Sequence, residues 1–213
     1  MTIRHHLSDQ LLMAYAAGRL PEAFSLVVAT HLSLCDDCRA QAGSFDALGG
    51  ALLEEAGESA MGEDALAQAL ARIEGLPQAR TEGPKPAGIF PAPLAGHVGG
   101  GPDAVRWRRV GGGVKQAILP TGKGATARLL FIPAGMAVPD HGHRGMELTL
   151  VLQGAFADRD ESFGPGDVEI SDETVEHTPT VLAGQDCICL AATDAPLRFR
   201  GLIARLAQPF LRI

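Results

Sequence analysis

The sequence predicts an α+β protein of two domains, with an all-α N-terminal domain followed by an all-β C-terminal barrel. Apolar residues recur at helical spacing through roughly the first 75 residues, whereas later short apolar runs alternate with Gly, Pro and Asp turns. A chain of 213 residues is long enough for two small domains. We therefore expect a helical domain at 1–80, a linker at 81–96 and a β-barrel domain at 97–213.

Four helices are expected in the first domain. Ser8 can cap the first helix and Gly18 can end it, while Pro21 suits the first turn of the second. The expected helical segments, in chain order, are DQLLMAYAA, PEAFSLVVATHLSLC, RAQAGSFDALGGALLEEA and EDALAQALARIE. The stretch that follows, GLPQARTEGPKPAGIFPAP, is rich in Pro and Gly and predicts the linker.

Short strands are expected after the linker. Turn sequences such as PTGKG, PAG and FGPGD separate them, and this regular alternation is typical of a sandwich or barrel. The expected strands lie in AVRWRRV, VKQAILP, ARLLFIP, ELTLVLQGAFAD, DVEIS and DCICLAAT.

The charge of the chain argues against several function classes. The net charge is −7, and residues 1–80 carry 5 Lys+Arg against 11 Asp+Glu. This balance disfavours direct binding to nucleic acid or to an anionic membrane, and an acidic helical domain suits a basic partner. The N-terminal MTIRHHLSDQ lacks the apolar run of a signal peptide, and no apolar run is long enough to span a membrane. We therefore expect a cytoplasmic location.

The segment HLSLCDDC predicts a metal site in the helical domain. On a helix, His31 and Cys35 would lie on one face, and Cys38 would follow where the chain turns back. Clustered Cys and His in the cytoplasm indicate metal, and a Cys2His2 set is typical of structural zinc. The fourth ligand would be His5 or His6. Two alternatives are a redox C-x2-C pair and two unrelated core thiols beside a surface histidine.

A second set of ligands lies in GMAVPDHGHRGMELTLVLQG. His141 and His143 alternate on an extended strand and so face the same side. Glu147 can face the same interior, and a barrel can bring His177 beside them. Three imidazoles and one carboxylate suit zinc or another divalent ion such as iron, manganese or nickel. The alternative is that the H-x-H pair is simply a polar strand edge.

The second half of the chain resembles a cupin. The string G-x5-H-x-H-x3-E-x6-G and the later P-G-D turn match the two cupin motifs over about residues 97–195. The resemblance implies a small antiparallel barrel with a metal held by His141, His143, Glu147 and His177. The Asn that usually follows the last histidine is absent from HTPTV.

The first half resembles zinc-binding anti-sigma domains, which use H-x3-C-x2-C and an upstream histidine. Together the two halves resemble the ChrR-type anti-sigma factors, in which the fourth zinc ligand falls on His6. The resemblance implies that the helical domain wraps a group IV (extracytoplasmic-function) sigma factor and blocks its contact with core RNA polymerase. It also implies that the cupin domain is needed for release under singlet oxygen or organic peroxide stress.

Three functions are consistent with these motifs. A regulator without enzyme activity is favoured, because nothing outside the metal ligands forms an acid/base pair or a nucleophile. The alternatives are a metal-dependent cupin oxygenase or isomerase with a helical assembly module, and an oxidation-labile zinc chaperone. Cys187 and Cys189 alternate on an expected strand, where they are either buried core thiols or a redox pair near the barrel metal.

Overall fold

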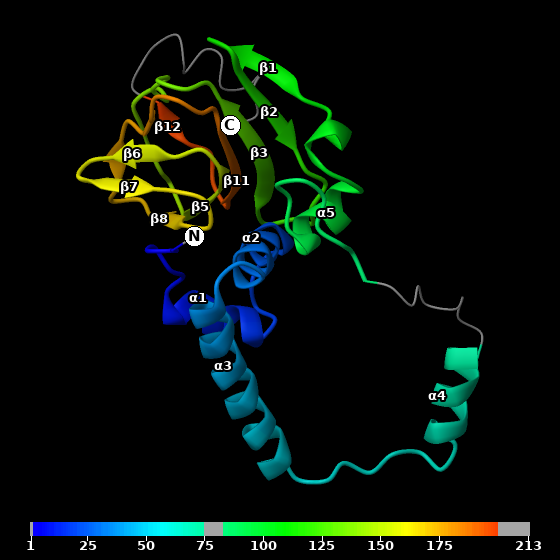
Figure 1. The fold of residues 1–213 in the computed structure, drawn as a ribbon. Helices are drawn as coiled ribbons and strands as arrows, with labels where there is room; N and C mark the ends of the chain where they lie inside the picture. The colour runs from blue at the N-terminus through cyan, green and yellow to red at the C-terminus, as the bar shows by residue number, and fades with distance from the viewer. Residues whose placement is uncertain (1, 75–82, 200–213) are drawn as a thin grey trace.

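The computed structural model describes residues 2–74 and 83–199, with helices first and strands after them (Figure 1). All four predicted helices are present, as is an additional helix that begins within the segment predicted as the linker. The helices are α1 (Asp9–Ala16), α2 (Glu22–Leu32), α3 (Asp36–Glu55), α4 (Ala65–Glu74), α5 (Ala92–Val98) and the short 3-10 helix η1 (Pro102–Ala104).

The boundary between α2 and α3 differs from the prediction that one helix runs on through Cys35. α2 ends at Leu32, and Cys35 is the N-cap of α3, where its Sγ accepts a hydrogen bond from the backbone N–H of Cys38 at 3.4 Å. Asp36 and Asp37 occupy the first turn of α3, where negative charge is favourable to a helix. Cys38 therefore lies inside a helix rather than beyond the end of one.

The strands form one large sheet and two small ones. The large sheet is six-stranded and antiparallel, in the order β1-β2-β3-β11-β5-β8. Its strands are β1 (Arg108–Gly111), β2 (Val114–Ile118), β3 (Thr126–Ile132), β5 (Glu147–Gln153), β8 (Val168–Ser171) and β11 (Cys187–Thr193). One small sheet has the order β10 (Thr180–Val181), β6 (Phe156–Asp158), β7 (Glu161–Phe163). The other has the order β12 (Arg198–Phe199), β4 (His141–Gly142), β9 (Glu176–His177).

Gly154 divides the segment that was predicted as one strand, ELTLVLQGAFAD. β5 ends before it and β6 begins after it, in a different sheet. Gly154 has φ 71°, and a Cβ there would lie 2.5 Å from the carbonyl oxygen of Asp186. Only glycine fits this turn, which carries the chain from the large sheet into a small one.

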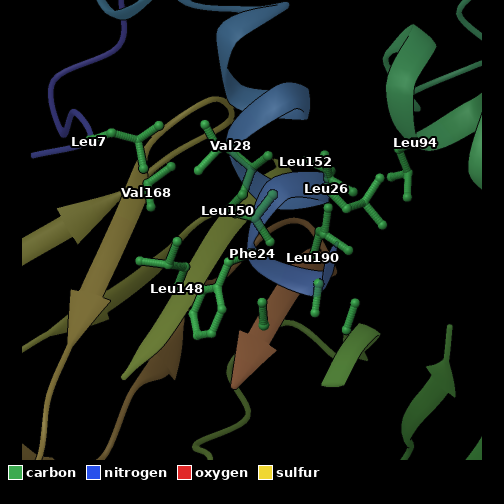
Figure 2. Close-up of a cluster of buried hydrophobic side chains, with 14 of the residues drawn as sticks. Leu7, Phe24, Leu26, Val28, Leu94, Leu148, Leu150, Leu152, Val168 and Leu190 are labelled. Atoms are coloured by element: carbon green, nitrogen blue, oxygen red, sulfur yellow. The ribbon is translucent and has the colours of Figure 1, made fainter. Parts of the chain in front are cut away.

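Helix α2 packs against the large sheet of the barrel (Figure 2). Phe24 and Val28 of α2 are buried together with Leu148 and Leu150 of β5 and Leu190 of β11. One hydrophobic core therefore runs from the helices into the barrel. This contact is the main feature that the sequence did not predict, because helical and strand periodicity each define a buried face without saying what covers it.

Part of the segment predicted as a linker is folded. Phe90 and Leu94 are fully buried, and α5 packs against α2. Pro91 is the N-cap of α5, so the proline that indicated a linker starts a short helix instead. Residues 81 and 82 lie outside the described part of the chain, and the domain limits stay a prediction.

The far end of α3 and all of α4 expose large apolar side chains. Leu52 and Leu53 are 61% and 75% exposed on α3, and Leu66, Leu70 and Ile73 are 50–71% exposed on α4. Helix α4 buries no residue although it is strongly amphipathic. Across residues 2–74 and 83–199, we find no helix with the length and apolar character that crossing a membrane requires.

Candidate metal centres

Four side chains converge in the N-terminal cluster, which consists of His6, His31, Cys35 and Cys38. One ligand atom from each lies within 4.8 Å of the others. Nδ1 of His6 is 3.3 Å from Sγ of Cys35 and 3.5 Å from Sγ of Cys38. Tetrahedral zinc places a nitrogen and a sulfur ligand about 3.5 Å apart, so these separations suit zinc. The structure brings together the four residues of the sequence prediction.

The imidazole of His31 is oriented by the barrel. Its Nδ1 donates a hydrogen bond to the carbonyl oxygen of Gly166 at 2.9 Å. Nε2 is then buried with no hydrogen-bond partner, and His31 has no exposed surface. A buried ring nitrogen that faces two thiols and has no hydrogen-bond partner is suited to bind a metal. Burial lowers the pKa of His31, which favours the neutral ring that a metal needs.

The Cys38 thiol is buried within the N-terminal cluster. Burial raises the pKa of the Cys38 thiol to about 11, so a metal that binds here at neutral pH displaces its proton.

His5 does not face the thiols. Its ring lies 4.2 Å from that of Phe163, and its Nε2 is 3.7 Å from the carboxylate of Glu161. Of the two candidates for the fourth ligand, only His6 faces the thiols.

Three imidazoles converge in the barrel cluster, which consists of His141, His143 and His177. Strand pairing places His141 of β4 opposite His177 of β9. Nε2 of His177 lies 3.1 Å from Nε2 of both other histidines. Nitrogen ligands of one tetrahedral ion are separated by about 3.3 Å, so the three rings fit a common metal.

Hydrogen bonds on the outer nitrogens hold two of these rings. Nδ1 of His141 donates to the carbonyl oxygen of Pro139 at 2.8 Å, and Nδ1 of His177 lies 2.9 Å from Oδ2 of Asp158. Glu169 adds a second carboxylate 3.6 Å from the same nitrogen of His177. Burial lowers the pKa of His177, but Glu169 and Asp158 outweigh it and the pKa is raised. Such partners fix the tautomer that turns Nε2 towards a metal.

Sequence reasoning missed Asp158 and Glu169. Asp158 is 19 residues before His177 and lies on β6, and Glu169 lies on β8. Neither has a fixed spacing to the histidine motif, so no local pattern marks them. An acidic residue inside an otherwise apolar strand was the available signal.

Glu147, the predicted fourth ligand of the barrel, is not part of the group of three converging nitrogens. Its Oε2 lies 3.5 Å from Nδ1 of His143, and its Oε1 accepts a hydrogen bond from Thr149 at 3.1 Å. Burial raises the pKa of Glu147, but His143 and the Thr149 hydroxyl outweigh it and keep the pKa below its usual value. The side chain is therefore a buried carboxylate beside the cluster, and its role as a ligand stays a prediction.

Cys187 and Cys189 lie side by side on β11, outside both clusters. Both are buried, and their sulfurs are 3.4 Å apart without a disulfide. Contact with Cys187, together with burial, raises the pKa of the Cys189 thiol well above its usual value. Their burial among apolar side chains fits the expectation of core residues.

The comparisons with known proteins identify the family. The family described as "ChrR Cupin-like domain" matches residues 96–196. The anti-sigma-E factor ChrR of Cereibacter sphaeroides is 62% identical over 213 residues, which is the whole of both chains. The chain belongs to the ChrR family of anti-sigma factors. The resemblance found in the sequence is confirmed, as is the α+β order of an N-terminal helical part followed by a cupin barrel.

A solved ChrR structure has the same architecture. It is the anti-sigma ChrR of Rhodobacter sphaeroides, crystallised in complex with SigE. The superposition has a TM-score of 0.80 at 62% identity and covers 91% of this chain and 100% of that one. The helices and the barrel of the ChrR family thus recur together in this chain.

Proposed function

We propose that this chain inhibits a group IV (extracytoplasmic-function) sigma factor by binding it through the helical domain, residues 1–80. The observation that supports this most strongly is the 62%-identical ChrR structure, which is bound to SigE. The acidic character of residues 1–80 suits a basic partner. The chain acts in the cytoplasm, where the sigma factor would otherwise reach RNA polymerase.

The exposed apolar faces of α3 and α4 supply the binding surface in this proposal. Leu66 and Leu70 lie one helical turn apart on α4, and Leu52 and Leu53 lie in the last turn of α3. Exposed apolar side chains that neighbour one another, as Leu66 and Leu70 do, mark protein–protein interfaces. An amphipathic helix that buries nothing within its own chain is suited to dock into a groove on a partner.

Replacing two of these leucines tests the surface. We expect Leu66→Glu/Leu70→Glu to weaken binding to SigE of Rhodobacter sphaeroides by roughly 30-fold or more, the range of interface hot spots. Fluorescence anisotropy with labelled SigE measures the change. The control Gln68→Glu/Arg72→Gln makes the same change in net charge on the polar face of α4, and we expect it to bind normally. If the unaltered chain fails to bind SigE, the proposed function is wrong.

We further propose that each cluster holds one metal ion. Zinc would be bound by His6, His31, Cys35 and Cys38, and would join the N-terminal segment to α2 and α3. In the barrel, zinc or another divalent ion would be bound by the three histidines with Glu147 as the fourth ligand. A bound ion would fix the geometry of its protein ligands and keep Cys35 and Cys38 as thiolates, which oxidants can attack. The barrel would act as a sensor of singlet oxygen or organic peroxide without enzyme activity.

The barrel cluster can be tested separately from inhibition. We expect His141→Ala to inhibit transcription from a SigE-dependent promoter normally in untreated cells, but to lose most of its release under singlet oxygen or organic peroxide. The reason is that His141 supports the barrel metal and does not touch the exposed faces of α3 and α4. His97→Ala, a histidine on α5 outside both clusters, is the control. Constitutive sigma activity in the His141 variant would instead show that the barrel cluster is needed to bind and inhibit the sigma factor.

A further inference from the structure

One segment of the barrel contacts both sides of the N-terminal cluster. Asp167, which is 2% exposed, accepts hydrogen bonds through Oδ1 from the backbone N–H groups of Arg4 at 2.7 Å and His5 at 3.0 Å. The backbone N–H of Val168 donates to the carbonyl oxygen of His5 at 3.2 Å. These bonds join the chain immediately before His6 to the start of β8, beside which the N-terminus lies in Figure 1.

The Asp167 carboxylate is built to stay ionised in this position. Its other oxygen, Oδ2, accepts a hydrogen bond from the N–H of Gly164 at 2.9 Å. Burial raises the pKa of Asp167, but the N–H groups of Gly164, Arg4 and His5 outweigh it and hold the pKa below its usual value. Charge-assisted hydrogen bonds of this kind are about twice as strong as neutral ones.

The residue before Asp167 holds a second ligand of the same cluster. The carbonyl oxygen of Gly166 accepts the Nδ1–H of His31, which directs Nε2 towards the thiols. Neighbouring residues of the barrel thus hold the ring of one predicted ligand, His31, and the backbone of the two residues that precede another, His6. Two residues after Asp167, Glu169 contacts His177 of the barrel cluster. The segment Gly166–Glu169 therefore touches both clusters.

We propose that residues 166–169 of the barrel form the outer support of the N-terminal metal site, with Asp167 as a positioning residue for His6 and Gly166 for His31. The barrel then controls how tightly the helical part holds its metal. This inference rests on the metal site of the proposed function and adds to it the route by which a change in the barrel reaches the helices.

Cobalt binding to the full-length chain tests the proposal. Thiolate-to-cobalt charge transfer reports on the N-terminal cluster, because the barrel ligands include no thiol. Outer-shell losses cost about 10- to 100-fold in metal affinity, so we expect Asp167→Ala to weaken cobalt binding by that factor in competition with a chelator. Asp167→Asn keeps one acceptor for Arg4 and His5, and we expect it to bind more tightly than Asp167→Ala. The control Asp172→Ala removes an exposed aspartate at the other end of β8, and we expect wild-type affinity.

The outcomes separate this inference from the proposed function. If the unaltered chain gives no thiolate–cobalt band, the metal site itself is wrong. If the band forms and Asp167→Ala binds cobalt as tightly as Asp172→Ala, the metal site stands and the support by the barrel is wrong. Should Asp167→Ala fail to fold, Asp167→Asn decides: weaker cobalt binding than wild type supports the proposal, and equal binding overturns it.

Discussion

Replacing Cys38 with Ala should remove the metal from the N-terminal cluster and free the sigma factor. The variant leaves three ligands, and a structural zinc site contributes on the order of 10 kcal/mol to the folding of so small a unit. Without that contribution, we expect the N-terminal segment to be held less firmly against α2 and α3. We expect the affinity for SigE to fall by more than about 100-fold, because the interface depends on a few preorganised side chains.

In vitro transcription with SigE and core RNA polymerase measures this loss, together with the metal content of the purified chain. Cys187→Ala is the matched control, since it removes an equally buried thiol from β11 outside both clusters. It should keep the N-terminal metal and inhibit normally. Full inhibition by a Cys38→Ala chain that has lost this metal would contradict a structural role for the N-terminal cluster.

Replacing Phe24 with Ala should destabilise the helices and the barrel together. Phe24 is 3% exposed and belongs to the core that α2 shares with the barrel. Truncation of a buried Phe costs about 3–5 kcal/mol, which corresponds to a decrease in Tm of roughly 10 °C for a chain of this size. Helical circular dichroism and Trp107 fluorescence report on the two parts during thermal unfolding of the metal-loaded protein.

We expect both signals to shift by the same amount, because one core underlies them. Met13→Ala is the control, since Met13 is 49% exposed on α1 and its loss should change Tm little. A variant in which the helical signal melts earlier while the Trp107 signal is unchanged would show that the two parts unfold independently.

The sequence predicts the elements of this fold better than their contacts. The helices and the barrel follow from periodicity and turn residues, and the histidine and cysteine spacings lead to residues that converge in space. The start of α3 at Asp36 was missed because a cysteine is an unusual N-cap. Helix α5 was missed because Pro91 indicates a linker as readily as a helix start.

The supporting residues of both clusters were harder to predict than the ligands. Ligands repeat at spacings that coordination imposes, whereas their supports can come from any strand that passes nearby. Asp167 acts on Arg4 from more than 160 positions away in the chain. Gly166 acts through a backbone carbonyl, which every residue type possesses, so its identity carries no signal.

The apolar side of α2 has a consequence for how inhibition ends. Complete separation of the helices from the barrel would expose Phe24 and Val28 to water, together with the leucines that they cover. Exposure of each such side chain costs about 1.5–3 kcal/mol. That cost opposes complete separation of the helices from the barrel. We therefore expect release to need only a local change in the segment that carries the metal ligands, with the core between α2 and the large sheet still closed.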